Sequence, residues 1–286
     1  MSLYLNIEPD EWIPNQYFMP ECISSQKSGM MKKASVKQIK LWRKLSQKKY
    51  RSEYNLFFAE GERCVEQILQ NGKIGIEALL VSDPNKVDSG FAGRFSAYRV
   101  SEDEMNSITD TENPQGVAAV CKIPAEPAPE QLADVSGIIV ATDGIQDPGN
   151  LGTIIRTASW FGAKALLAGS GTVDPWNSKV VRSAAGAIGT VPVVSGNLVE
   201  LLPHFEKTGW QVYLLESGTS SNDIRSVEKQ KKSILVTGNE ANGISNALFK
   251  NSRQKIKISG RRFSGVESLN AAIALSIALF HFFETD

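Results

Sequence analysis

Apolar and polar residues follow two different periods along the chain, which predicts a protein of mixed helices and strands. From Ser35 onward, apolar side chains recur every three positions, as they do on one face of a helix. These side chains are Val36, Ile39, Trp42 and Leu45. Short apolar runs predict strands at 55–61, 76–83, 97–101 and 117–123. Helical patterns separate the first of these runs, so the pattern indicates an α/β domain.

A proline-rich stretch then divides the chain. Pro124, Pro127 and Pro129 each fix their own backbone and restrain the preceding residue, so they predict a stiff linker. The first thirty residues lack periodicity. The predicted segments are therefore a leader or disordered arm, a smaller first α/β domain, a linker and a second α/β domain, at residues 1–30, 31–123, 124–132 and 133–286.

The second domain again alternates strands with helices. Residues 137–144 form a continuous apolar run, and the helical pattern after it is expected to end at Gly162. Four later apolar runs are also predicted strands, and continuous apolar strands suit a parallel sheet that is covered on both faces. The last helix is apolar nearly all round, so we expect it to be buried in the core or against another subunit.

The distribution of charge along the chain is more informative than the overall composition. The net charge is zero, yet ten basic residues and no acidic residue lie between Cys22 and Ser52. Clustered Lys and Arg suit a polyanionic partner because they displace counterions from phosphates, although a solvated helix face is the alternative. The candidate contacts are Lys40, Arg43, Lys44, Lys48, Lys49 and Arg51.

Several classes of protein are disfavoured. The three cysteines are widely spaced, which predicts a reducing cytoplasm, and two histidines are too few for a histidine-rich metal site, so no metal is expected. No signal peptide is visible. The most apolar run, 269–283, is shorter than the roughly 20 residues that a membrane helix needs, so no membrane partner is expected.

Three segments of the second domain contain candidate catalytic or binding residues. In the first, DPGNLGTIIRTA at 147–158, the chain turns after a strand, Asn150 can cap the next helix, and Arg156 falls on its second turn. The second, LVTGNEANGIS at 235–245, ends a strand in a tight loop. The third, GVESLNAAIALSIAL at 265–279, opens a helix. Each segment taken alone also fits an ordinary cap or turn.

Together, in this order and spacing, the three segments closely resemble the motifs of the SpoU family of RNA 2′-O-methyltransferases, which belong to the knotted SPOUT superfamily. The resemblance covers residues 133–286. The first domain, with YRSEYNLFFAEGERCVEQIL at 50–69 and NPQGVAAVCKIP at 113–124, resembles that family's ribosomal-protein-like substrate-binding domain. Two features depart from the family pattern: Ile258-Ser259 replaces the usual Ile-Pro, and the following loop is longer and contains Arg261 and Arg262.

The resemblance implies a parallel-sheet domain with a deep trefoil knot, a homodimer packed through that domain, and S-adenosylmethionine as cofactor. It also implies site residues. Arg156 is expected to stabilise the developing alkoxide electrostatically, with Asn150 orienting the RNA. The implied catalytic residues are Arg156, Asn150, Glu240, Ser268 and Asn270, and the implied cofactor contacts are Gly238, Asn239, Ile258 and Leu269.

The predicted reaction is therefore methylation of a ribose 2′-hydroxyl. The separate first domain favours ribosomal RNA as the substrate. Two alternatives stay open: a transfer-RNA ribose methyltransferase with the same catalytic domain, and a non-catalytic RNA-binding or ribosome-assembly factor that keeps the fold.

Overall fold

The protein is described here from a computed structural model, which places residues 31–83, 95–111, 114–260 and 268–283. The predicted leader at 1–30 lies outside these described residues, as do Arg261 and Arg262 of the longer loop. Among the described helices, none is long and apolar enough to cross a membrane.

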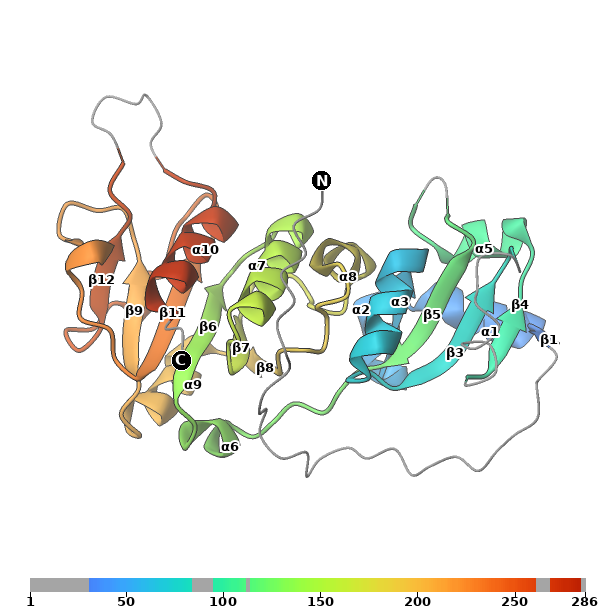
Figure 1. Ribbon diagram of the computed structural model, residues 1–286, viewed down its shortest axis with the longest axis horizontal. Helices are drawn as coiled ribbons and strands as arrows, with labels where there is room; N and C mark the ends of the chain where they lie inside the picture. The colour runs from blue at the N-terminus through green and yellow to red at the C-terminus, as the bar shows by residue number, and fades with distance from the viewer. Residues whose placement is uncertain (1–30, 84–94, 112–113, 261–267, 284–286) are drawn as a thin grey trace.

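The N-terminal part is built on a mixed five-stranded sheet with the order β1-β4-β3-β5-β2 (Figure 1). β5 runs antiparallel to both β2 and β3, and β4 runs parallel to β3. The strands are β1 (Lys32–Lys33), β2 (Leu56–Glu60), β3 (Ile76–Val81), β4 (Ala97–Arg99) and β5 (Val117–Lys122). The helices are α1 (Val36–Lys44), α2 (Lys48–Tyr54), α3 (Glu62–Asn71) and α5 (Glu102–Ile108).

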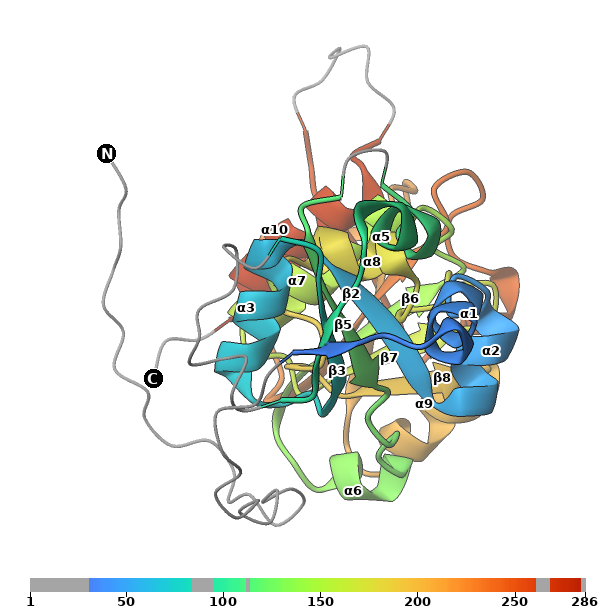
Figure 2. The same cartoon turned by 90° about the vertical axis from the view of Figure 1, so that its right-hand side faces the viewer.

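Helices cover both faces of this sheet. Figure 2 shows α3 on one side and α1 and α2 on the other. Ser35 caps α1 and forms a capping box with Gln38, which is why the helix begins where the apolar period begins. Ile39 and Trp42 are buried on the predicted face, whereas Val36 is 71% exposed because it precedes the part of α1 that packs.

The C-terminal part is an all-parallel seven-stranded sheet with the order β10-β12-β9-β11-β6-β7-β8. The predicted α/β fold with a parallel sheet is thereby confirmed. The strands are β6 (Gly137–Asp143), β7 (Ala165–Gly169), β8 (Val193–Gly196), β9 (Gln211–Leu215), β10 (Asn222–Asp223), β11 (Lys232–Gly238) and β12 (Gln254–Lys257). The helices are α6 (Pro129–Ala133), α7 (Pro148–Trp160), α8 (Ser178–Ala184), α9 (Leu198–Glu206) and α10 (Ala271–Phe282).

Two apolar layers cover the parallel sheet. The helices α7, α8 and α10 cover one face, and α6 and α9 cover the other (Figure 1). Their apolar side chains pack against the sheet. Because every strand runs in the same direction, all the carboxyl ends meet at one edge. β6 pairs with β11, so the loops that follow these two strands leave the sheet side by side.

The proline-rich segment is fastened to the C-terminal sheet. Residues 129–133 of this region form α6, with Pro129 at its first position. Before it, the Glu126 carboxylate accepts hydrogen bonds from the Ser195 N–H (3.0 Å) and the Ser195 hydroxyl (2.8 Å) at the end of β8. The segment therefore follows a defined path between the two sheets.

The two parts share one continuous apolar core. Alternate residues of β2 and β5 face it, and the ring of Phe57 lies 5.1 Å from that of Trp176. Polar contacts surround this junction. The Glu60 carboxylate pairs with Arg182 and accepts from the Thr111 hydroxyl, and burial raises the pKa of Glu60 against the opposing effect of Arg182. These contacts hold the N-terminal sheet against α8.

The structure contradicts the prediction that Arg51 contacts RNA. Its side chain is only 4% exposed, and its Nε (2.8 Å) and Nη2 (2.5 Å) donate to Asp174 on the loop after β7. Nη1 donates to the carbonyl oxygens of Leu45 and Ser46, both at 2.8 Å. The guanidinium thus joins α2 to the C-terminal part. Because it is buried, it is not accessible for contact with a nucleic acid.

We expect Asp174→Ala to lower the free energy of unfolding by about 3 kcal/mol, because the Arg51 guanidinium would stay buried without a counter-charge. The matched control is Glu77→Ala. It removes the exposed Lys122–Glu77 pair and should cost below about 1 kcal/mol. Urea unfolding of the two variants measures both values, and equal losses would contradict a structural role for the buried pair.

Candidate active site

The three segments singled out in the sequence meet at the carboxyl edge of the parallel sheet. Asn150 Nδ2 donates to Glu240 Oε1 at 2.8 Å, and Asn270 Nδ2 donates to Asn150 Oδ1 at 2.9 Å. The partners are 90 and 120 residues apart in the chain. This hydrogen-bonded triad (Asn150, Glu240, Asn270) joins three of the five predicted catalytic residues.

The helix cap differs from the prediction. α7 begins at Pro148, and its N-cap is Asp147, whose carboxylate accepts from the Asn150 N–H at 2.8 Å. Proline at the first helical position favours this earlier start because it needs no hydrogen-bonded N–H there. Asn150 therefore lies inside the first turn, and its amide group is free to join the triad.

Glu240 is held as an anion. In addition to Asn150, the N–H groups of Gln146 and Asp147 point at its carboxylate, both at 3.4 Å. Partial burial alone would raise the pKa of Glu240. The hydrogen bonds from Asn150 and from backbone N–H groups outweigh it, so the pKa lies below the ordinary value. The fixed negative charge in turn orients the Asn150 amide.

Asn270 has two functions at once. Its Oδ1 accepts from the N–H groups of Ala272 (2.9 Å) and Ile273 (3.2 Å). Asn270 is therefore the N-cap of α10, as expected of an ordinary helix start. Its Nδ2 simultaneously completes the triad. Ser268 lies two residues earlier, is exposed, and forms no hydrogen bond with another residue in the described part of the chain.

The loop after β11 depends on a glycine. A Cβ at position 238 would lie 2.2 Å from the carbonyl carbon of Gly243, so no larger residue fits without moving the backbone. Asn239 closes the loop: its Nδ2 donates to the Gly144 carbonyl at 2.7 Å, and its Oδ1 accepts from the N–H groups of Ala241 and Asn242. The Asn239 side chain is therefore used to position the loop.

The other predicted cofactor contacts lie at the same edge. Ile258 follows β12 and packs partly against the core, and Leu269 precedes α10 with 46% of its surface exposed. β12 pairs with β9, and β9 pairs with β11, so the segments that follow Gly238 and Lys257 share that edge. Apolar side chains beside loop backbone suit a ligand that has both an aromatic and a polar end.

Arg156 stands apart from the triad. It is the ninth residue of α7, which places it on the third turn and about 9 Å along the axis from Asn150. The side chain is exposed and has no hydrogen-bond or ionic partner among the residues that the structure describes. Its charge is thus available for a bound molecule or a second chain.

The basic residues of the N-terminal part form an exposed surface on α1 and α2, with Arg51 excepted. Tyr50 lies within it, with the Lys44 Nζ 4.9 Å and the Lys49 Nζ 5.7 Å from its ring centre. The exposed members are Lys40, Arg43, Lys44, Lys48 and Lys49. Two residues of these sites were not predicted from the sequence. Asp147 could have been recognised as a helix cap because it directly precedes a proline. Tyr50 could have been recognised as part of an RNA-binding surface because it is an aromatic residue among lysines.

Comparison with known families identifies this arrangement. Residues 137–280 match the SpoU rRNA Methylase family, and residues 37–119 match the MRM3-like substrate binding domain. The chain therefore belongs to the SpoU rRNA methylase family, as its motifs predicted.

Relatives of known name agree over nearly the whole chain. It is 36% identical over 250 residues to the 23S rRNA (guanosine(2553)-2′-O)-methyltransferase RlmP of Bacillus subtilis, covering 87% of this chain and 96% of that protein. The structure is similar to an AdoMet-bound rRNA methyltransferase from Sinorhizobium meliloti, with a TM-score of 0.76, 30% identity, and coverage of 89% and 98%. A putative RNA methyltransferase of the TrmH family from Porphyromonas gingivalis gives a TM-score of 0.74 at 31% identity, with coverage of 87% and 98%.

Proposed function

We propose that this protein transfers a methyl group from S-adenosylmethionine to a ribose 2′-hydroxyl of ribosomal RNA. The observation that carries the proposal is the Asn150–Glu240–Asn270 triad, because it assembles the polar residues of all three family motifs at one edge of the sheet. Ribosomal RNA is favoured over transfer RNA by the MRM3-like substrate binding domain at 37–119 and by the relative that carries a 23S rRNA name.

The cofactor is assigned to the loops after β11 and β12 and before α10. The backbone around Gly238, Ile258 and Leu269 would hold it, with the close packing at Gly238 fixing the shape of the wall. Its sulfonium supplies the electrophilic methyl group. The S. meliloti structure named as bound to AdoMet supports this choice of ligand.

The chain's own groups then have distinct tasks. Asn150 keeps one Nδ2 hydrogen and a lone pair on Oδ1 beyond its two triad bonds, so it can orient a ribose or a phosphate. Arg156 would stabilise the oxygen as it gains negative charge. Glu240 and Asn270 would act through Asn150 by fixing its amide, and Ser268, two residues before Asn270, would support them.

The exposed lysines and Arg43 on α1 and α2 would dock phosphates of the RNA. Five basic side chains on neighbouring helices, with an aromatic ring among them, match the combination that single-stranded RNA requires. Arg51 is excluded from this surface by its burial.

A second copy of the chain is the partner that we assign to the outer face of α7 and α10. Trp160 of α7 is 79% exposed and Phe280 of α10 is 72% exposed. Ile273 and Ile277 are also exposed, and their spacing puts them on the same face of α10 as Phe280. Monomeric proteins rarely leave such a surface in water. A homodimer through the C-terminal part would cover it. The trefoil knot and the cytoplasmic location stay predictions.

Two alternatives are separable by experiment. A transfer-RNA methyltransferase would label transfer RNA rather than ribosomal RNA when each is incubated with the cofactor carrying a labelled methyl group. A non-catalytic RNA-binding or ribosome-assembly factor would bind S-adenosylmethionine or RNA and transfer no label. Mapping the labelled ribose tests the proposal directly.

Arg156→Ala should lower the rate of methyl transfer by about 10²–10³-fold, because a charge that acts on the transition state is lost. Affinity for S-adenosylhomocysteine, measured by calorimetry, should stay unchanged. Lys179→Ala removes an exposed cation from the neighbouring helix α8 and is the matched control. Normal turnover by folded Arg156→Ala protein would remove this residue from the mechanism.

Replacing Lys40, Lys44 and Lys48 together by Gln should flatten the plot of log RNA affinity against log salt by about two units, since each phosphate contact contributes about −0.7 to the slope. A control variant removes three exposed lysines, Lys207, Lys229 and Lys231, outside the α1–α2 surface. Binding to ribosomal RNA across a salt series measures both slopes. Equal slopes would show that the α1–α2 lysines only solvate their helices.

Phe280→Glu should convert dimers into monomers, because a charge would be buried in the apolar contact. Val199→Glu places the same charge on α9, which covers the opposite face of the sheet, and should leave the mass in solution unchanged. Sedimentation equilibrium measures both. A monomeric wild-type protein would refute the assignment.

A further inference from the structure

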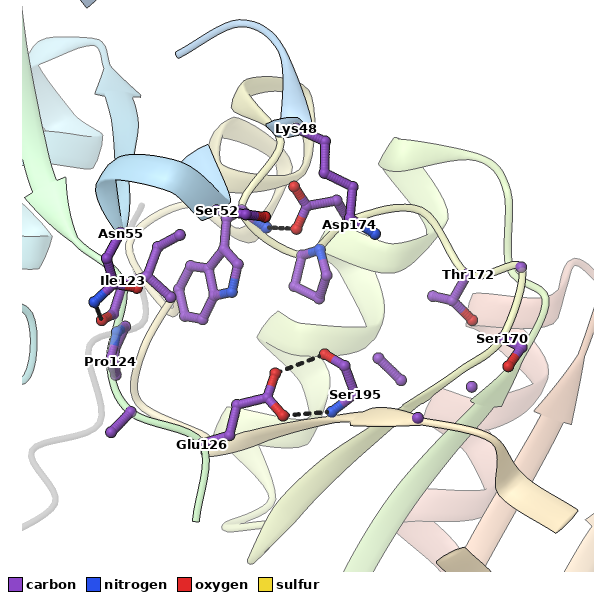
Figure 3. Close-up of a pocket in the computed structure, with 17 residues that line it drawn as sticks. Lys48, Ser52, Asn55, Ile123, Pro124, Glu126, Ser170, Thr172, Asp174 and Ser195 are labelled. Carbon is purple, nitrogen blue, oxygen red and sulfur yellow. Dashed lines mark hydrogen bonds between the residues drawn. The ribbon is translucent and has the colours of Figure 1, made fainter. Parts of the chain in front are cut away.

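A pocket of about 540 Å³ lies between the two parts of the chain (Figure 3). α2 forms one wall with Lys48 and Ser52. The proline-rich segment forms another with Ile123, Pro124 and Glu126. The loop after β7 and the end of β8 complete it. No residue of the three motifs at 147–158, 235–245 and 265–279, and hence none of the triad, lines this space.

The pocket and the triad share one edge of the sheet. β7 pairs with β6, and β8 pairs with β7, so the floor of the pocket lies one to two strand spacings, about 5–10 Å, from the strand that leads to Asn150. The loops also touch: the Thr172 hydroxyl donates to the Thr142 carbonyl at 3.1 Å, and the Val173 N–H donates to the Ile145 carbonyl at 2.8 Å. A strand of RNA that reaches the triad from the basic surface of α2 would pass this pocket.

The charges of the pocket do not suit a phosphate in its interior. Among the described residues that line it, the charged side chains are Lys48, Glu126 and Asp174. Asp174 is neutralised by Arg51. Glu126 brings a negative charge that the two hydrogen bonds from Ser195 fix in place. An anion in the interior would be repelled by the Glu126 carboxylate. Lys48 belongs to the α2 wall, next to the other lysines that we propose to dock phosphates.

The wall that contains Glu126 suits the edge of a nucleobase. Each oxygen of Glu126 accepts one bond from Ser195 and keeps a lone pair for another donor. Trp176, Pro124 and Ile123 supply apolar surface for the flat faces of a ring. Ser195 occupies the edge of the carboxylate that spans both oxygens, so a base reaches the free lone pair of one oxygen only. Guanine presents two adjacent N–H donors on its Watson–Crick edge, and both can approach that single oxygen, whereas uracil flanks its one N–H with two carbonyl oxygens that the carboxylate repels.

We propose that this pocket binds an unpaired base of the RNA strand beside the target ribose, with a preference for guanine, and that Glu126 is the residue that selects it. The proposal rests on the proposed function in taking RNA as the ligand. Lys48 would contact the phosphate of the same nucleotide. The site would thus set which sequence around the target is accepted.

The test compares three fluorescent RNA dodecamers: all uridine, uridine with one central guanosine, and uridine with one central inosine. Wild-type protein should bind the guanosine oligomer about tenfold more tightly than the uridine oligomer, the effect of one well-formed base contact. Inosine lacks the 2-amino group and should fall between them. Anisotropy titration measures all three affinities without requiring catalysis.

Glu126→Gln should lose most of the guanosine preference while retaining affinity for the uridine oligomer. Glu130→Gln makes the same change on exposed α6 outside the pocket and should keep the preference. Ser52→Leu narrows the pocket from α2 without altering Glu126 and should also reduce the preference. Equal affinities of the wild type for all three oligomers, or a preference that survives in both pocket variants, would overturn the proposal.

Methyl transfer by the wild type is scored separately. A protein that methylates ribosomal RNA but shows no guanine preference loses only the pocket assignment. A protein that shows the preference and loses it in Glu126→Gln, yet transfers no methyl group, loses the proposed reaction and keeps the RNA site.

Discussion

The parallel pairing of β6 with β11 is the contact on which the candidate active site depends. Its register joins Gly137 to Lys232 at one end and Asp143 to Gly238 at the other. Both strands therefore end at the same level, and their loops start from adjacent positions. Asn150 and Glu240 can form a hydrogen bond only because this register brings them together. The cap of α10 then adds Asn270 to the same place.

The second constraint is the junction between the two sheets. Apolar side chains from β2 and β5 continue into the layer formed by α7 and α8, and the Arg51–Asp174 and Glu60–Arg182 pairs border it. The N-terminal part is thereby held at a fixed angle to the parallel sheet. Its basic surface, the interdomain pocket and the triad consequently keep constant distances from one another, which favours recognition of RNA of defined shape over adaptable binding.

Much of the fold could be predicted from the sequence because its signals are local. Continuous apolar runs gave the parallel strands, and the period of three gave α1. The three motifs gave the residues of the triad through resemblance. The cap of α7 was misplaced by one turn, since both Asp147 and Asn150 are good caps and only Pro148 decides between them. The burial of Arg51 and the pocket at Glu126 depend on which strands are neighbours. Strand order is a non-local property that no short stretch of the sequence reveals.

The packing at Gly238 limits which substitutions this sequence can accept during evolution. Every codon change that replaces this glycine adds at least one carbon atom, and that atom would overlap the backbone of Gly243. No substitution of Gly238 can therefore be accepted without moving the backbone of this loop. A descendant that has abandoned the chemistry is free to lose Arg156, whose side chain has no partner in the described part of the chain, while still requiring the glycine to fold this loop. Under the proposed mechanism, loss of the arginine with retention of the glycine would distinguish a chain that keeps the fold from one that keeps the reaction.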